Sequence, residues 1–181
     1  MTIHVPAILV VLVTTACSGA VVSPSAGQLS LPEATPSPSA APTAAPGTTY
    51  RSTVYPYTMQ LPSGWQANAD GTGFEGPDGM TLTIGSGQPE PGQTVEDRVA
   101  ANRLEFPDCT SDPADDAPIT LGGEPGILWS MRCGATLGLA ANTIHNGVGY
   151  RLLLRLPDSA AAMTQATAAM DGFLASFAFT D

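Results

Sequence analysis

The chain has 181 residues, the length of one domain of ordinary size. It carries 16 acidic residues against six basic ones, all of them arginines, and its formal net charge is −10. So few cations cannot neutralise a phosphate backbone, which argues against nucleic-acid binding. Because the chain contains no lysine, P-loop, Schiff-base and Ser-x-x-Lys chemistries are excluded.

The N-terminus combines an apolar run with a cysteine. Residues 5–13 read VPAILVVLV, an apolar run shorter than the about 20 residues that span a bilayer but typical of a secretory signal. Small residues at positions 14–16 then precede Cys17. This pattern resembles a bacterial lipoprotein signal. The resemblance implies that residues 1–16 are removed and that the Cys17 thiol is lipidated, with palmitate as one of the acyl chains. Thr14 stands where these signals most often have leucine, and a cleaved signal that leaves Cys17 free is the alternative.

The stretch from Cys17 to residue 49 is predicted to be a tether. Proline, alanine, serine and threonine make up 21 of the 27 residues from Ser23 to Thr49. Such a segment lacks the apolar side chains that would offset its ordering entropy, so we expect an extended, partly polyproline chain. It would join a membrane anchor to a single globular domain over residues 50–181, on the extracytoplasmic face of the cell membrane.

The first half of the domain shows hairpin signals. Alternating side chains over residues 53–61 predict a strand, and Pro56 places it near an edge or at a bulge. Turn sequences at residues 62–64 and 76–79 flank the next part, and residues 80–84 alternate again.

Two helices are predicted. Residues 94–106 form the first, with Thr94 as N-cap and Asp97 in the capping-box position. Residues 159–177 form the second, with Asp158 as the expected cap.

Three strands are predicted between these helices, over residues 127–133, 137–141 and 148–156, and Asn146–Gly147 is a two-residue hairpin signal. In the last strand the leucines lie opposite Arg151 and Arg155. The element order predicts the α+β class: an antiparallel sheet flanked by helices.

Three stretches resemble PsbP-like domains: YPYTMQLPSGW at residues 55–65, GYRLLL at 149–154 and FLASFAF at 173–179. The resemblance, which extends to actinobacterial lipoproteins of the LpqN type, implies an α/β/α sandwich around an antiparallel sheet. Such domains are mostly adaptors or accessory subunits, so the resemblance carries over no catalytic residue and no cofactor.

If Cys17 takes lipid, Cys109 and Cys133 remain as a pair in an oxidising compartment, where a disulfide is the default. A redox-active pair is the alternative, although the spacing is not Cys-x-x-Cys.

Polar candidates for a site are few. Asp108, Asp112, Asp115 and Asp116 are predicted to be a solvated acidic loop, with a calcium site as the alternative. His145 adjoins the Asn146–Gly147 turn and is expected to be a surface turn residue, although a hydrolase that uses His145 with a nearby serine remains an alternative.

Four aromatic residues are expected to pack in the core or at its rim, with the lining of a small ligand pocket as the alternative: Tyr57, Trp65, Trp129 and Tyr150. The leading functional hypothesis is a monomeric, envelope-anchored and non-catalytic module that docks another exported protein. The alternative is a carrier that holds a small apolar or lipid ligand between sheet and helix.

Overall fold

The computed structural model describes residues 47–181. The predicted signal, Cys17 and the tether up to residue 46 lie outside the described residues. Strand β1 (Thr48–Arg51) begins two residues before the expected start of the domain, so the last two residues assigned to the tether belong to a strand. None of the helices in the described part has the length and apolar character needed to cross a bilayer.

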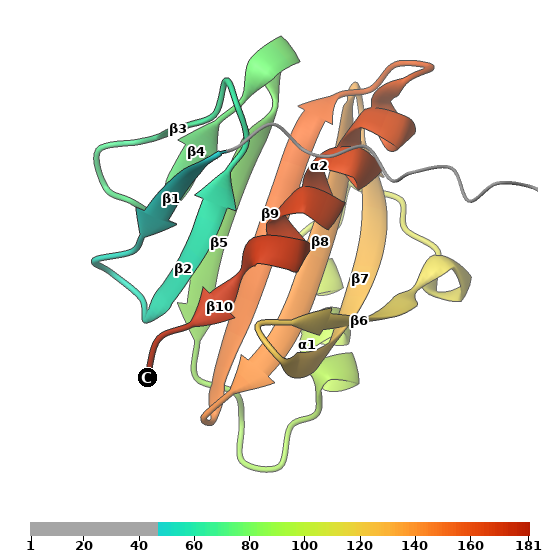
Figure 1. Ribbon diagram of the computed structural model, residues 1–181. Coiled ribbons are helices and arrows are strands. Elements are labelled where there is room, and N and C mark those ends of the chain that lie inside the picture. Colours follow the sequence, from blue (N-terminus) through green and yellow to red (C-terminus); the bar gives the residue numbers. More distant parts are fainter. Residues whose placement is uncertain (1–46) are drawn as a thin grey trace, which may run out of the picture. The chain divides into compact units, whose positions relative to one another are not determined.

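A seven-stranded antiparallel sheet forms the centre of the domain, in the order β3-β4-β5-β9-β8-β7-β6 (Figure 1). The strands are β3 (Gln66–Ala67), β4 (Gly73–Glu75), β5 (Thr81–Gly87), β6 (Ala117–Leu121), β7 (Glu124–Cys133), β8 (Thr136–His145) and β9 (Val148–Pro157). A short 3₁₀ helix precedes β5, η1 (Pro77–Gly79), and another precedes β6, η2 (Pro113–Asp115).

The β8–β9 hairpin closes at Asn146–Gly147, as predicted. His145 pairs with Val148, and φ is 49° at Asn146 and 73° at Gly147. Two successive positive φ values define the turn that matches the twist of antiparallel strands, which explains why asparagine and glycine stand there.

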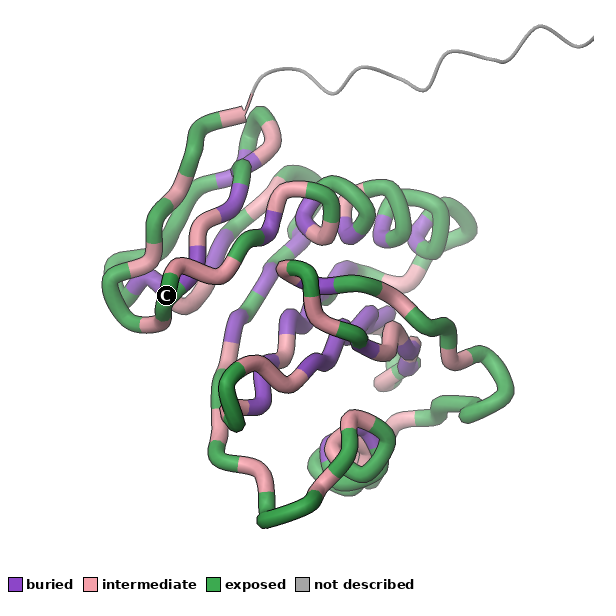
Figure 2. The backbone as a smooth tube through the Cα atoms, turned by 60° about the horizontal axis from the view of Figure 1, so that its bottom comes forward, coloured by how far each residue is buried: buried purple, intermediate pink, exposed green. Residues whose placement is uncertain are grey.

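One face of the sheet is covered by α2 (Ala162–Ser176) together with a small sheet of β1, β2 (Tyr57–Leu61) and β10 (Ala178–Phe179). The edge of the Trp65 ring packs against Phe173 of α2, with ring centroids 4.9 Å apart. Figure 2 shows buried positions recurring on the side of α2 that faces the sheet. The buried side chains of this layer are Tyr57, Met59, Leu61, Trp65, Phe74, Met80, Leu82, Ile84, Leu121, Leu137, Leu139, Ala141, Leu152, Leu154, Leu156, Ala162, Ala166, Met170, Phe173 and Phe177.

The opposite face carries α1 (Val95–Leu104), which packs on β7 and β8. The predicted capping box is confirmed: the Thr94 hydroxyl accepts the Asp97 N–H, and the Asp97 carboxylate accepts the Thr94 N–H. The buried cluster under α1 is much smaller than the one under α2 and consists of Val99, Trp129, Met131, Ala140 and Leu153. The predicted α+β class, with helices on both faces of an antiparallel sheet, is therefore confirmed.

Two local predictions were wrong. The strand expected over residues 53–61 begins only at Tyr57, after Pro56, because proline cannot donate to a strand ladder. Asp158 does not cap α2, whose N-cap is Ala161 with no side-chain cap; the Asp158 carboxylate pairs instead with Arg132.

Candidate functional site

The disulfide between Cys109 and Cys133 is present, as predicted. It joins the segment after α1 to the end of β7, beside a two-way backbone pairing of Thr110 with Arg132. A cross-link with a sequence separation of 24 stabilises the fold by about 3.5 kcal/mol in the chain-entropy model. The covalent bond therefore compensates for the small apolar cluster under α1.

The four aromatic candidates do not line one pocket. Tyr57 and Trp65 belong to the α2 layer, whereas Trp129 belongs to the α1 layer on the other side of the sheet. Tyr150 is 4% exposed and packs against Phe179, with ring centroids 4.9 Å apart. Burial raises the pKa of the Tyr57 and Tyr150 hydroxyls. These side chains pack in the core. Twenty buried residues lie between α2 and the sheet, and a hollow of about 180 Å³ remains beside Met163 near the start of α2, lined also by Leu128 and Leu139.

The four aspartates do not converge on a cation. Asp116 forms an ion pair with Arg103, and the Asp112 carboxylate accepts the N–H of Ala114 at the start of η2. Within residues 47–181, no three His, Cys, Asp or Glu side chains are grouped so that they could hold a metal ion. The described residues thus give no support to the calcium alternative for Asp108, Asp112, Asp115 and Asp116.

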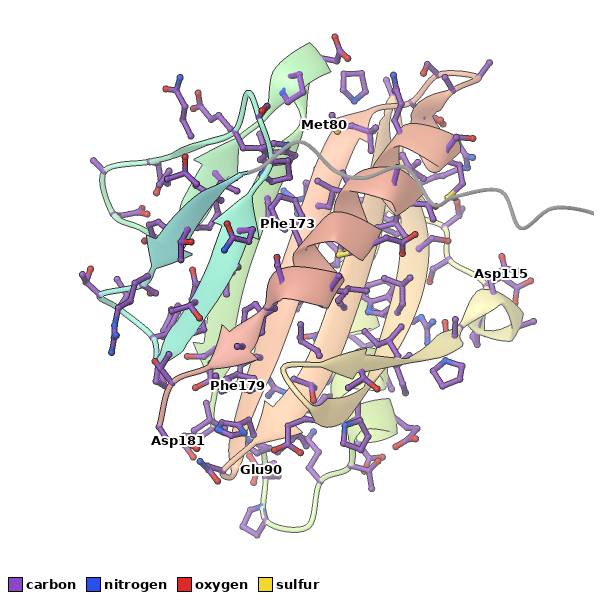
Figure 3. The ribbon with its side chains drawn as sticks, viewed as in Figure 1. Met80, Glu90, Asp115, Phe173, Phe179 and Asp181 are labelled. Carbon is purple, nitrogen blue, oxygen red and sulfur yellow. A yellow bond between two sulfur atoms is a disulfide. The ribbon has the colours of Figure 1, made fainter. Side chains whose placement is uncertain are left out.

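His145 occupies the predicted turn, but its ring is largely enclosed. The side chain is 11% exposed and stacks on Phe179, with ring centroids 3.9 Å apart. Figure 3 labels Phe179 and Asp181, the two residues that His145 contacts near the C-terminus. Its Nδ1 lies 2.9 Å from Glu124 Oε1, and its Nε2 lies 2.9 Å from Asp181 Oδ1. No local sequence pattern indicates this cluster, because its carboxylates lie 21 and 36 residues from His145 along the chain.

The contacts of His145 work against the hydrolase alternative. A catalytic histidine needs one ring nitrogen free to accept a proton from a serine hydroxyl, and here a carboxylate faces each nitrogen. Burial by itself lowers the pKa of His145, but the hydrogen bonds and charges of Glu124 and Asp181 outweigh it and raise the pKa above its ordinary value. The arrangement stabilises an imidazolium that holds the end of the chain against the β8–β9 hairpin.

Part of the sheet beside α1 is left uncovered. On this side β5 presents Thr81 and Thr83, which are exposed, and Thr81 pairs with Arg155 of β9. Arg98 of α1 reaches over Gly149 of β9, where a Cβ atom would come within 2.8 Å of its Nε. Three arginines thus follow the outer side of β9: Arg98, Arg151 and Arg155.

The three arginines differ in their partners. Arg151 Nη1 donates to Glu105 Oε2 at 2.7 Å. Among the described residues, neither Arg98 nor Arg155 forms an ion pair. The Arg155 guanidinium instead lies over the ring of Phe106, with Cζ 5.4 Å from the centroid. The positive charges of Arg98 and Arg155 are therefore available to a ligand, although the chain as a whole is acidic.

A hollow of about 250 Å³ lies between the disulfide and Arg155. Phe106, Met131, Gly138 and Thr136 complete its lining. This hollow, with its apolar wall and one arginine that forms no ion pair among the described residues, could not be predicted from the sequence. Its residues come from the segment after α1 and from β7, β8 and β9, which are distant along the chain.

No family model matches the sequence, and the search of curated proteins found no match. Solved structures do match. The chain is similar to cyanobacterial PsbP (CyanoP) from Synechocystis sp. PCC 6803, with a TM-score of 0.51 and 16% identity, covering 78% of this chain and 97% of that chain.

The chain is also similar to LpqN of Mycobacterium tuberculosis, described as involved in cell envelope biogenesis, with a TM-score of 0.50, 16% identity and coverage of 76% of this chain and 87% of that chain. A variant of the protein Mog1 matches with a TM-score of 0.53 and 9% identity, and the match covers 75% of this chain and 96% of the Mog1 chain. The domain has the PsbP-like fold. The resemblance seen in the sequence is therefore confirmed for the fold.

The raised pKa of His145 makes the stability of the domain depend on pH. The contribution is fully present below pH 6.5, the ordinary value, and is lost as the pH rises through the higher folded value. Replacing His145→Gln should therefore lower the free energy of unfolding in urea more at pH 6 than at pH 9. The control Asp171→Asn, at an exposed position of α2, should leave the pH dependence unchanged. An equal loss at both pH values for His145→Gln would contradict the assignment.

Proposed function

We propose that this chain is a lipid-anchored envelope protein whose domain serves, without catalysis, as a docking module for another exported protein. The lipoprotein-like pattern that ends at Cys17 supports export and anchoring on the extracytoplasmic face of the membrane. The PsbP-like fold, shared with LpqN, supports an accessory role. We assign the domain no reaction and no cofactor.

The observation that carries the docking proposal is the uncovered outer side of β5 and β9. On the α2 side the same two strands are fully buried at Leu82, Ile84 and Leu154. On the α1 side, Thr81, Thr83 and Arg155 are exposed. A sheet that is covered on one face and uncovered on the other offers its uncovered face as a flat surface to a partner.

Charge complementarity indicates the kind of partner. The domain gathers Arg98, Arg151 and Arg155 along β9, and two of them have no ionic partner in the described part of the chain. A protein surface or segment that presents carboxylates fits this row, because guanidinium groups form bidentate pairs with carboxylates. We infer that a monomer of the domain, held by its tether, binds an acidic region of the partner.

The carrier alternative is less well supported. The hollow beside Met163 of α2 measures about 180 Å³, and a larger ligand between α2 and the sheet would have to displace core side chains such as Phe173 and Met170, which are fully buried. Cores are packed to near-crystal density, so such displacement is costly.

Photo-crosslinking in intact cells tests the docking face. A photoreactive residue at Thr83 should give one discrete adduct, because this position is exposed on the uncovered side of β5. A photoreactive residue at Gln165, on the outer side of α2, is the matched control and should give none. Arg155→Glu should abolish the Thr83 adduct, whereas Arg51→Glu on β1 should not. Adducts that are unaffected by Arg155→Glu, or equal from both positions, would contradict the proposal.

Fractionation of cells tests the anchor. Cys17→Ser removes the thiol that would carry the lipid, so the protein should lose labelled palmitate and move out of the membrane fraction. A lipid anchor of two or more chains is stable, whereas a single weak contact is not. Retention of Cys17→Ser in the membrane fraction, with no loss of label, would contradict lipidation at this position.

A further inference from the structure

The hollow beside the disulfide has an apolar interior. Phe106 and the bridge between Cys109 and Cys133 line it together with Met131. Gly138 makes room for Met131, because a Cβ atom at position 138 would come within 2.9 Å of the Met131 Cγ. These side chains favour an apolar group over water.

The size of the hollow limits the group that it can hold. Its volume is about 250 Å³. An apolar cavity of about 150 Å³ holds a benzene molecule, whereas pockets for drug-sized ligands start at about 300 Å³. The hollow therefore fits one aromatic ring or a short aliphatic chain, and it is too small for a full-length acyl chain.

Arg155 is the one charged residue among those that line the hollow. Arg155 lines it and is exposed, and its guanidinium is held over the face of Phe106. No carboxylate among the described residues pairs with it. A guanidinium whose orientation is already fixed by an aromatic ring loses little freedom when it binds a carboxylate.

We propose that this hollow is a binding site for a small apolar carboxylate, with the apolar group between Phe106 and the disulfide and the carboxylate paired with Arg155. Two sources share this chemistry: a free aryl or short-chain carboxylic acid, and the C-terminal apolar residue of a peptide. The site goes beyond the docking role, because it requires neither the anchor nor the partner.

Direct binding to the purified, oxidised, full-length mature chain tests the site. The probes are phenylpropionate, its neutral amide, and the dipeptide acetyl-Ala-Phe with a free or an amidated C-terminus, each followed by calorimetry and by NMR shifts of the protein. We expect saturable one-to-one binding of at least one free carboxylate, with its amide about tenfold weaker or worse. Tighter binding of the dipeptide acid would identify a peptide C-terminus as the source, and tighter binding of phenylpropionate a free acid.

Two pairs of variants complete the test. Arg155→Gln should weaken the binding of the carboxylate by about tenfold, while Arg51→Gln, which removes an exposed arginine of β1, should leave it unchanged. Thr136→Phe should block the hollow, with retained circular dichroism as the check on folding. Absence of saturable binding, equal affinity for acid and amide, or no effect of Arg155→Gln would overturn the proposal. Because these measurements need no partner, their failure would leave the docking proposal standing, and failed crosslinking would leave this site standing.

Discussion

Strand β9 sends alternate side chains into two different layers. Leu152, Leu154 and Leu156 enter the core under α2, while Leu153 joins the cluster under α1, between two arginines of the same face. Because side chains alternate along a strand, a shift of one residue in the pairing would place arginines in the core and leucines in solvent. The hairpin turn at Asn146–Gly147 fixes this register, and the neighbouring strands are aligned through it.

The two layers are held in different ways. The α2 layer buries twenty apolar side chains, so its stability comes from the hydrophobic effect and close packing. The α1 layer buries five, and α1 is held by the disulfide, by the ion pair of Arg103 with Asp116 and by the contact of Arg151 with Glu105. Because the α1 layer is held by a disulfide and polar contacts rather than by a broad apolar interface, part of the sheet face beside α1 remains uncovered. The docking face and the ligand hollow both lie on that lightly covered side.

The sequence was sufficient for features that depend on neighbours along the chain. The alternation in β9, the capping box of Thr94 and the turn at Asn146–Gly147 each follow from a local pattern, and all are present. The small sheet could not be predicted, because β10 pairs with β2 from the opposite end of the domain. The site was missed for the same reason: the carboxylates of His145 and the wall of the hollow meet only after the strands pair. Core packing was expected for the four aromatic residues, but they could not be assigned to one layer or the other, because the sequence does not say which face of the sheet each one occupies.

Amide hydrogen exchange along the mature chain, before and after reduction of the disulfide, tests most directly whether the two layers are stabilised separately. The account predicts that reduction makes the amides of α1, including those of Val99 and Asn102, exchange much faster. The amides of Leu154 in β9 and Phe173 in α2 should keep their protection, because their layer is held by packing. Equal loss of protection in both layers, or unchanged protection of α1, would contradict the division into two layers on which the proposed docking face rests.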